Sequence, residues 1–242
     1  SPWWRRDDLA YDESGRLCLA GEDLEHLARS AGQPVFAYSG GRLAENLGRL
    51  RGALATIPHP TRILYAMKAN RFLPVLGRLK AAGIDGIDVC SPGEVRFARQ
   101  AGFREDQISF TGNSVSNADL DCLAAHPGVW VNCDSLSTIR RLGERSPGRK
   151  IGLRINPQVG VGYRRNEQLR YAGGTATKFG IYPDRIGEAV ALAEEVGLSV
   201  TGIHFHAGCG YLDDQLENFR EVLRVARPLL SGISQLEHIN LG

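Results

Sequence analysis

Short runs of apolar, mostly β-branched residues recur along the chain, separated by longer stretches in which apolar residues repeat at helical spacing. Stripes of this kind cover 73–82, 95–101 and 186–196 and are typical of amphipathic helices. The short runs predict seven strands, at residues 62–67, 86–90, 107–111, 129–133, 150–156, 200–206 and 238–241. Strands and helices therefore alternate over most of the sequence.

This alternation indicates an α/β fold with a parallel sheet, because a helix that connects two parallel strands packs back onto the sheet. Crossovers repeated this often favour a (β/α)8 barrel of the TIM type over an open, doubly wound sheet. A further strand candidate at 35–39 precedes a helix at 43–54, so the pattern allows eight strands in all.

Residues 1–34 precede the regular pattern and are predicted to form an N-terminal extension. It contains a strand-like run at 16–19 and a helix near 24–30. No linker rich in proline, serine or charge divides the remainder, so we predict a single barrel domain over 35–242.

Charge and hydropathy narrow the classes of partner. The 29 Lys and Arg residues nearly balance the 27 Asp and Glu residues, and a formal net charge of +2 gives no strong field to hold a polyanion. Charged residues or glycine interrupt every apolar stretch before it reaches the roughly 18 to 20 residues that a membrane-spanning helix needs. We therefore expect neither a nucleic-acid partner nor a membrane.

The cysteine content indicates the redox compartment. There are 5 cysteines, an odd number, and no two of them form a C-x-x-C pair. This argues against a disulfide framework and against a ribbon-type zinc site. A reducing cytoplasm is the expected setting.

Polar residues lie at or just after the carboxyl ends of the predicted strands. In a parallel barrel these ends meet at one mouth, where reactive groups gather. The residues are Lys68, Asp88, Asn113, Asp134, Arg154, Asn156, His204, His206 and Asn240. Lys68 follows an apolar strand, where partial desolvation of its amine would favour the neutral, nucleophilic form that can make a Schiff base. The alternative is an ordinary, solvated lysine at the rim, since most lysines are exposed.

Arg154 ends a strand that is otherwise apolar. A guanidinium at such a place needs a partner, and we expect that partner to be Asp88 or Asp134. A long loop, predicted over 157–180, follows the same strand, and loops of that length are usually functional. Its basic residues and glycines could receive a carboxylate or a phosphate, or could form an ordinary solvated loop.

A zinc site is an alternative at the end of the sixth strand. His204 and His206 face the same side of that strand, and Cys209 extends them to H-x-H-x-x-C. No third ligand cluster accompanies them at a usual spacing, and Gly208 and Gly210 favour backbone that approaches a ligand instead. We therefore expect no metal.

Seven short motifs follow one another along the chain. They are YAMKAN at 65–70, DVCSPGE at 88–94, FTGN at 110–113, LRINP at 153–157, KFG at 178–180, HFHAGC at 204–209 and INLG at 239–242. This series resembles that of the fold-type III, alanine-racemase-like pyridoxal-phosphate decarboxylases, which act on diaminopimelate, ornithine, lysine or arginine. Diaminopimelate decarboxylase is the most similar member, and the match covers about residue 35 to residue 242.

The resemblance implies pyridoxal 5'-phosphate as the cofactor. The cofactor-binding residues that it implies are Lys68, Asp88, Arg154, His206, Gly208, Cys209 and Gly242. Lys68 would hold the cofactor as a Schiff base and yield it to the substrate amine, and His206 would stack on the pyridine ring; these two are the implied catalytic residues. Gly242 would begin a glycine loop whose amides bind the phosphate.

Three features depart from the family pattern. Cys209 replaces a serine, and a thiol is a weaker donor to phosphate than a hydroxyl. The loop over 157–180 lacks the pattern associated with diaminopimelate decarboxylase, so the substrate does not follow directly. The chain also stops inside the glycine loop, and we expect it to be a barrel truncated before its last strand and before a C-terminal β-domain on which residues 1–34 would pack.

The resemblance implies decarboxylation of an amino acid, with a diaminopimelate-like or related diamino or dicarboxylic substrate, in a homodimer with shared active sites. Two alternatives stay open: an amino-acid racemase on the same barrel, and a barrel that binds pyridoxal phosphate without turnover. The racemase is less favoured because Asn70-Arg71-Phe72 follows the lysine motif, where racemases have a different continuation.

Overall fold

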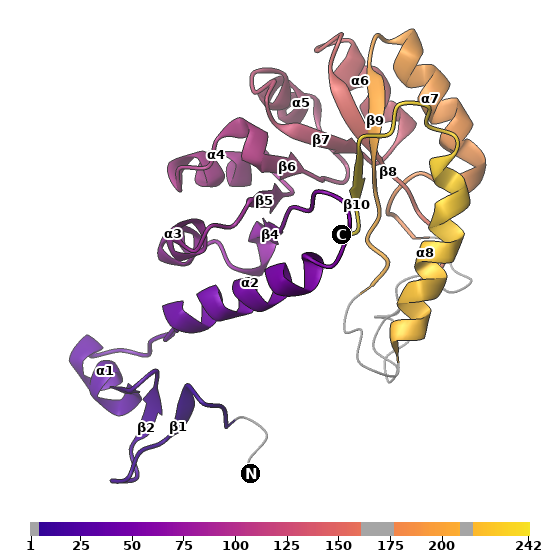
Figure 1. The fold of residues 1–242 in the computed structure, drawn as a ribbon. Helices are drawn as coiled ribbons and strands as arrows, with labels where there is room; N and C mark the ends of the chain where they lie inside the picture. Colours follow the sequence, from indigo (N-terminus) through magenta and orange to yellow (C-terminus); the bar gives the residue numbers. More distant parts are fainter. Residues whose placement is uncertain (1–4, 161–176, 209–214) are drawn as a thin grey trace. The chain divides into compact units, whose positions relative to one another are not determined.

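The computed structural model describes residues 5–160, 177–208 and 215–242. The chain forms two compact units, one of Ser1–Tyr65 with Ala69–Gly86 and the other of Ala66–Lys68 with Ile87–Gly242. Figure 1 shows the elements of both. Cys209, Gly210 and most of the loop predicted over 157–180, including its basic residues Arg164 and Arg165, lie outside the described residues.

The first unit begins with a small antiparallel sheet and a capped helix. Strands β1 (Leu9–Tyr11), β2 (Leu17–Leu19) and β3 (Glu22–Asp23) pair in that order. Helix α1 (Leu24–Ala31) follows at once, because the Asp23 carboxylate accepts a hydrogen bond from the His26 backbone amide and so caps the first turn. The predicted strand at 16–19 and helix near 24–30 are confirmed.

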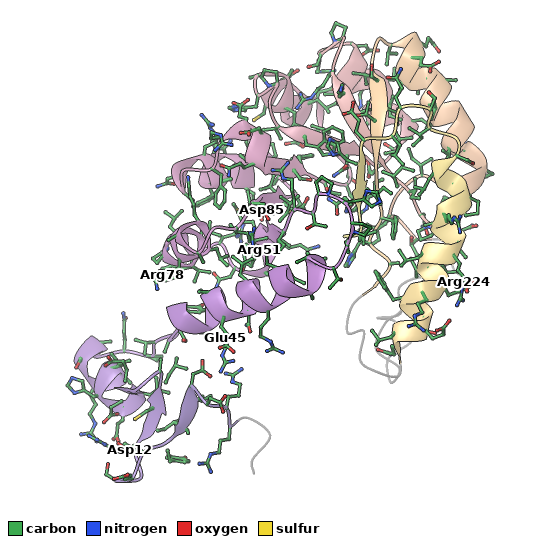
Figure 2. All side chains as sticks on the ribbon, in the orientation of Figure 1. Asp12, Glu45, Arg51, Arg78, Asp85 and Arg224 are labelled. Atoms are coloured by element: carbon green, nitrogen blue, oxygen red, sulfur yellow. The ribbon has the colours of Figure 1, made fainter. Side chains whose placement is uncertain are left out.

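Two further helices complete the first unit: α2 (Gly40–Leu54), whose first turn Ser39 caps, and α3 (Leu73–Ala81), which packs against α2. The Arg51 guanidinium, near the end of α2, lies 3.2 Å from the Asp85 carboxylate (Figure 2). The same carboxylate accepts a hydrogen bond from the Ile63 amide at 2.8 Å. Asp85 therefore ties α2 to the segment that leads into strand β4 (Leu64–Ala66).

The strand candidate at 35–39 is wrong. The segment is not paired with another strand, and its large side chains stand in solvent, with Phe36 90% exposed. A β-branched and aromatic run reads as a strand, but a strand also needs a partner for its backbone groups. The count of eight strands thus falls to the seven that the regular pattern predicted.

All seven of those strands are present. The sheet has the order β10-β9-β8-β7-β6-β5-β4, and the pairings from β5 to β10 are parallel. Beyond β4 its strands are β5 (Gly86–Val89), β6 (Ile108–Phe110), β7 (Trp130–Cys133), β8 (Lys150–Arg154), β9 (Ser199–His204) and β10 (His238–Asn240). Neighbours in the sheet are neighbours in sequence, which is the arrangement of a (β/α)8 barrel.

Helices connect these strands: α4 (Pro92–Gln100), α5 (Asn117–Ala124), α6 (Leu136–Gly143), α7 (Ile186–Glu195) and α8 (Leu216–Leu230). Figure 1 shows α4, α5, α6 and α7 on one side of the sheet. Serines 91, 116 and 135 cap α4, α5 and α6 by accepting a backbone amide of the first turn. A short 3-10 turn, Pro183–Arg185, precedes α7, and the helix predicted from the stripe at 186–196 is confirmed.

The two faces of the sheet differ in chemistry. Ile87 and Val89 of β5 are buried, as are their counterparts on the later strands, and these residues form the core with the helices. The alternate positions carry Asp88, Ser109 and Asn132, which bond to one another instead. One face therefore supplies stability, and the other is free to carry chemistry.

No helix within residues 5–160, 177–208 and 215–242 is long and apolar enough to cross a bilayer. The four cysteines of these segments, at 18, 90, 122 and 133, are free thiols. The reducing environment inferred from the sequence stays a prediction.

Thr201 on β9 offers a test of the buried core. Its side chain is fully buried, and its hydroxyl has no hydrogen-bond partner in the described part of the chain. A Thr201→Val variant removes a desolvated hydroxyl without breaking a bond, so we expect the free energy of unfolding to rise by about 1 kcal/mol. Denaturant titration measures this, and a loss of stability would show that the hydroxyl is bonded after all.

Candidate active site

The predicted site residues gather at the carboxyl ends of the strands of the second unit. Lys68 lies in the 3-10 turn Met67–Ala69 directly after β4, and Asp88 lies on β5. Arg154 and His204 are the last residues of β8 and β9, and they are paired in register with each other. Since parallel strands end at one edge, residues distant in sequence meet there.

Lys68 is exposed, as the alternative of a solvated rim lysine predicts, and not partly desolvated, because it lies in the turn after the strand and not on the strand itself. Its charge nevertheless acts on the other groups of the site. It lowers the pKa of the Asp88 carboxyl and of the His204 and His206 imidazoles. The amine therefore lies within electrostatic reach of the three.

Asp88 carries the most unusual carboxyl of the site. Burial is the largest influence and raises its pKa to about 6, while hydrogen bonds from Ser109 and Thr111 and the charges of Lys68 and Arg154 act in the opposite direction. The Thr111 hydroxyl donates to Asp88 Oδ1 at 3.1 Å. A carboxyl with a pKa near neutrality exchanges its proton readily at physiological pH, a property common at functional sites.

The expected pairing of Arg154 with Asp88 or Asp134 is wrong. The Arg154 guanidinium donates from Nη1 to Asn113 Oδ1 at 2.9 Å, and Asn113 in turn donates to Asp134 Oδ2 at 3.0 Å. The guanidinium also stands over the Phe179 ring, 4.6 Å from its centroid. The Asn113 amide thus links Arg154 to the Asp134 carboxylate, and the ring of Phe179, from the KFG motif, packs against the planar face of the guanidinium.

Arg154 and His204 both retain unused bonding capacity. Arg154 is 7% exposed and His204 4%, and neither Arg154 Nε nor His204 Nδ1 has a partner among the described residues. Burial lowers the pKa of His204 to about 3, so its imidazole is neutral at physiological pH. His206 is half-buried, and burial together with the Lys68 and Arg154 charges lowers its pKa as well.

The glycines of the last two motifs shape the backbone here. Gly242 has a φ of 87°, and a Cβ at this position would stand 2.7 Å from the Phe205 carbonyl oxygen, so only glycine fits. Its amide donates to Asn240 Oδ1 at 2.9 Å. Gly208 is buried and has a φ of 131°. Their contacts with a phosphate stay a prediction.

Metal binding finds no support in the described segments, where no three His, Cys, Asp or Glu side chains come together as a metal site would need. His204 and His206 are close to cationic groups, Arg154 and Lys68, which oppose the binding of a further cation.

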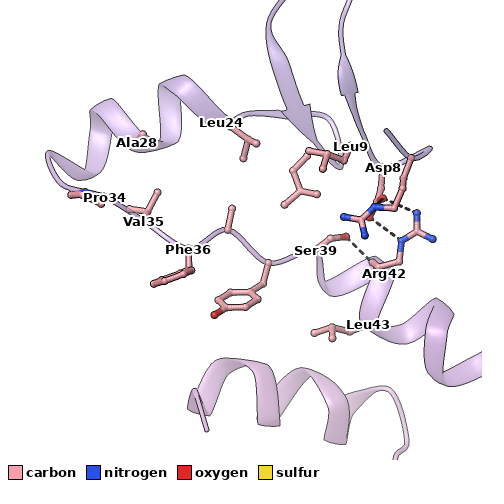
Figure 3. Close-up of a pocket in the computed structure, with 14 residues that line it drawn as sticks. Asp8, Leu9, Leu24, Ala28, Pro34, Val35, Phe36, Ser39, Arg42 and Leu43 are labelled. Carbon is pink, nitrogen blue, oxygen red and sulfur yellow. Dashed lines mark hydrogen bonds and ion pairs between the residues drawn. The ribbon is translucent and has the colours of Figure 1, made fainter. Parts of the chain in front are cut away.

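A second hollow, of about 640 Å³, belongs entirely to the first unit and holds none of the predicted site residues. Figure 3 shows residues that line it, among them Leu9, Leu24, Leu43 and Val35. Its polar members are paired, since Arg42 bonds both oxygens of Asp8, at 3.0 and 2.6 Å. The hollow is apolar and carries no group suited to chemistry.

The model of the family described as pyridoxal-dependent decarboxylase, pyridoxal binding domain, matches residues 42–242. The chain belongs to this family. Pyridoxal phosphate is accordingly the cofactor, as the motifs predicted, and the family resemblance drawn from them is confirmed. The fold prediction is confirmed as well, since the seven-stranded sheet with its connecting helices matches an incomplete (β/α)8 barrel of the alanine-racemase-like type.

The curated relatives include diaminopimelate decarboxylases. That of Methanothermobacter thermautotrophicus is 37% identical over 209 residues, which are 86% of this chain and 48% of the relative. That of Deinococcus radiodurans is 31% identical over 227 residues, 93% of this chain and 56% of the relative. The chain thus spans about half the length of the curated relatives it matches.

Solved structures agree. The diaminopimelate decarboxylase of M. jannaschii in co-complex with L-lysine has a TM-score of 0.81 at 25% identity, over 98% of this chain and 56% of that one. Another diaminopimelate decarboxylase has a TM-score of 0.67 at 26% identity, over 82% of this chain and 47% of that one. The shared fold therefore extends over nearly all of the chain.

The residues present fit the cofactor. Lys68 offers an amine to an aldehyde, and Arg154 offers a buried cation whose Nε has no partner in the part of the chain that the structure describes. In that same part His204 adds a ring nitrogen without a partner, and the glycine positions let backbone come close. An anionic, aromatic aldehyde suits such a set of donors.

Two residues missed as functional candidates are Ser109 and Asn132. Both interrupt otherwise apolar strands, in Ile108-Ser109-Phe110 and in Trp130-Val131-Asn132-Cys133. A polar side chain on a buried strand demands a hydrogen-bond partner, and that signal could have drawn attention to them. In the structure they connect to Asp88.

The buried acid and the buried base predict opposite pH dependences of stability. Asp88 has a folded pKa of about 6 against an ordinary 3.8, so the folded state holds its proton more tightly and stability falls as pH rises from about 4 to above 6. His204 has a folded pKa of about 3 against 6.5, so its contribution is present above pH 6.5 and is lost as pH falls towards 3.

The variants Asp88→Asn and His204→Gln separate the two contributions. Relative to Asp88→Asn, the unaltered protein should lose stability on the order of 2–3 kcal/mol between pH 4 and pH 7. Relative to His204→Gln, it should gain stability over the same range. Unfolding free energies measured at these pH values test both, and two slopes of the same sign would contradict the assignment.

Proposed function

We propose that this chain is the cofactor-binding part of an amino-acid decarboxylase that acts on a diaminopimelate-like or related diamino or dicarboxylic substrate. The gathering of an amine, a near-neutral carboxyl, a buried guanidinium and two neutral imidazoles at one edge of the barrel is the observation that carries the proposal. The diaminopimelate decarboxylases among the relatives support the substrate class.

Lys68 is the residue proposed to hold the cofactor, through the Schiff-base linkage that its motif predicts. Pyridoxal phosphate supplies an electron sink for the bond between Cα and the substrate carboxylate. The protein contributes orientation and electrostatics. Arg154, rigid between Asn113 and Phe179, supplies a fixed positive charge, and His206 supplies an aromatic face next to it.

Asp88 lies within reach of the Lys68 charge, which lowers the pKa of its carboxyl against the burial that raises it. The resulting pKa of about 6 makes both the charged and the protonated form of Asp88 accessible at physiological pH. A neutral His206 imidazole suits contact with an aromatic ring, because packing against the ring then removes no charged group from water.

The wider setting is part of the proposal. We expect a homodimer with shared active sites, a division between an extension over 1–34 and a barrel domain over 35–242, and a cytoplasmic location. The phosphate contacts of Gly208, Cys209 and Gly242 belong to it too. Sedimentation of the native protein with and without cofactor tests the dimer.

A decarboxylation assay tests the function. The native protein, loaded with pyridoxal phosphate, is offered meso-diaminopimelate, lysine, ornithine and arginine, and carbon dioxide and the product amine are measured. We expect release of carbon dioxide from diaminopimelate or another diamino or dicarboxylic substrate. Inversion of configuration at Cα without release of carbon dioxide would indicate a racemase instead. Cofactor binding without any turnover would indicate a protein that only carries the cofactor.

A further inference from the structure

A chain of hydrogen bonds crosses three neighbouring strands and ends on Asp88. The Thr111 hydroxyl, just after β6, donates to Asp88 Oδ1 at 3.1 Å. Asn132 on β7 donates from its one amide nitrogen to two hydroxyls, that of Thr111 at 2.9 Å and that of Ser109 at 3.2 Å. Ser109 also bonds to Asp88. Two hydroxyls are thus held between one amide and one carboxyl.

Trp130 fixes the direction of the whole chain. Its indole Nε1 donates to Asn132 Oδ1 at 2.9 Å, and an indole N–H can only donate. The amide oxygen of Asn132 must therefore face Trp130, which turns the NH2 group towards the hydroxyls. Because each hydroxyl oxygen accepts a hydrogen bond from that NH2 group, its own proton is free to be donated to the Asp88 carboxylate.

The backbone makes room for this arrangement. A Cβ on Gly152 of β8 would collide with Asn132 Oδ1, and one on Gly202 of β9 would stand 2.5 Å from the Trp130 ring. Gly152 and Gly202 are paired in register, so the two glycines lie side by side on adjacent strands. His238 on β10 meets the indole edge to face, with 4.9 Å between ring centroids. The Trp130 side chain therefore packs across the glycine positions of β8 and β9, and His238 contacts the far side of its ring.

We propose that Asn132 is a positioning residue: its amide group orients the Thr111 and Ser109 hydroxyls so that both donate to the Asp88 carboxylate. The indole of Trp130 fixes the orientation of that amide group. The purpose is to keep Asp88 able to ionise in a buried place. The inference rests on the proposed function only in taking Asp88 to serve the cofactor site.

Charged and titratable neighbours act on Asp88 from other elements. Lys68, in the turn after β4, and Arg154, at the end of β8, both favour its ionised form. Cys90, on the segment after β5, has its thiol 3.3 Å from the Glu94 carboxylate and a raised pKa, so it stays neutral. The hydroxyls of Ser109 and Thr111 act with the two cations, against the burial that raises the pKa of Asp88.

Thr111→Val and Thr111→Ser give the test, because valine matches threonine in shape without the hydroxyl and serine keeps the hydroxyl. In the full-length holoenzyme, the protonation of Asp88 is followed by difference infrared spectroscopy, with Asp88→Asn spectra to assign the carboxyl band. We expect Thr111→Val to raise the pKa of Asp88 by about one unit, since a donor to the charged form is lost. Thr111→Ser should restore it.

Two further variants separate positioning from packing. Thr201→Val makes the same chemical change at a buried hydroxyl without a partner in the described chain, and it should leave the pKa of Asp88 unchanged. Trp130→Phe keeps a ring but frees the Asn132 amide, and it should raise the pKa by a smaller amount than Thr111→Val. An unchanged pKa in Thr111→Val, or an equal shift in Thr201→Val, would overturn the inference.

The infrared result is independent of turnover. If Thr111→Val moves the pKa while no substrate is decarboxylated, the positioning role stands and the proposed function fails. If decarboxylation occurs and the pKa does not move, the function stands and the positioning role fails.

Discussion

Replacing Lys68 by alanine is expected to abolish covalent attachment of the cofactor and to lower kcat/KM for decarboxylation by at least about 10³-fold, which corresponds to roughly 4 kcal/mol of transition-state stabilisation. Lys68 is the amine at the edge where Asp88, Arg154 and His206 gather. Its removal takes away the nucleophile and leaves the buried groups in place. Absorbance of the bound cofactor and single-turnover kinetics measure the two effects.

Lys150→Ala is the matched control. Lys150 is the first residue of β8, at the opposite end of that strand from Arg154, and its amine pairs on the surface with Glu237. The same loss of an amine there should leave absorbance and turnover unchanged. Lys68→Ala with normal cofactor absorbance, or an equal loss in Lys150→Ala, would remove Lys68 from the role.

The strands were predictable because every second residue, on the face towards the core, is apolar, and parallel pairing requires little beyond that pattern. The residues at which the strands end were harder to predict. Met67 was assigned to a strand, but it begins the 3-10 turn that carries Lys68, and that turn is what exposes the amine. The alternation of strands and helices implied helix α8, but no residue range was predicted for it. Pro228 within its last turns interrupts the helical pattern, although the helix continues to Leu230.

The site was predictable as a gathering but not as a set of bonds. The rule that parallel strands deliver their last residues to one mouth was enough to bring Asp88, Arg154 and His204 together. Opposite charge then suggested a carboxylate as the partner of Arg154, whereas the structure supplies the amide of Asn113. Register and loop geometry decide such partners, and a single sequence carries neither.

Arg149, which the sequence analysis did not single out, is expected to give the largest loss of stability. The side chain is buried just before β8, and its guanidinium donates to three backbone carbonyls, those of Leu123 at 2.8 Å, His126 at 3.2 Å and Val129. These carbonyls lie between the end of α5 and the start of β7, and those of Leu123 and His126 each accept one backbone amide as well, from His126 and Val129. Burial lowers the pKa of Arg149, which shows that its charge is already costly to hold.

Arg149→Leu removes that cost, but all three carbonyls lose a charge-assisted bond, and the buried carbonyl of Val129 loses the side-chain donor that it has here. The second effect is the larger, so the free energy of unfolding should fall by about 3–5 kcal/mol, measured by denaturant titration. Arg149→Lys, with one compact ammonium in place of a planar fork, should recover part of the loss. Arg104→Leu, which breaks only an exposed pair with Asp106, should change stability within error. If Arg149→Leu were as stable as the unaltered protein, the carbonyls would have to be satisfied by groups other than this guanidinium, and the junction between α5 and β7 would not depend on it.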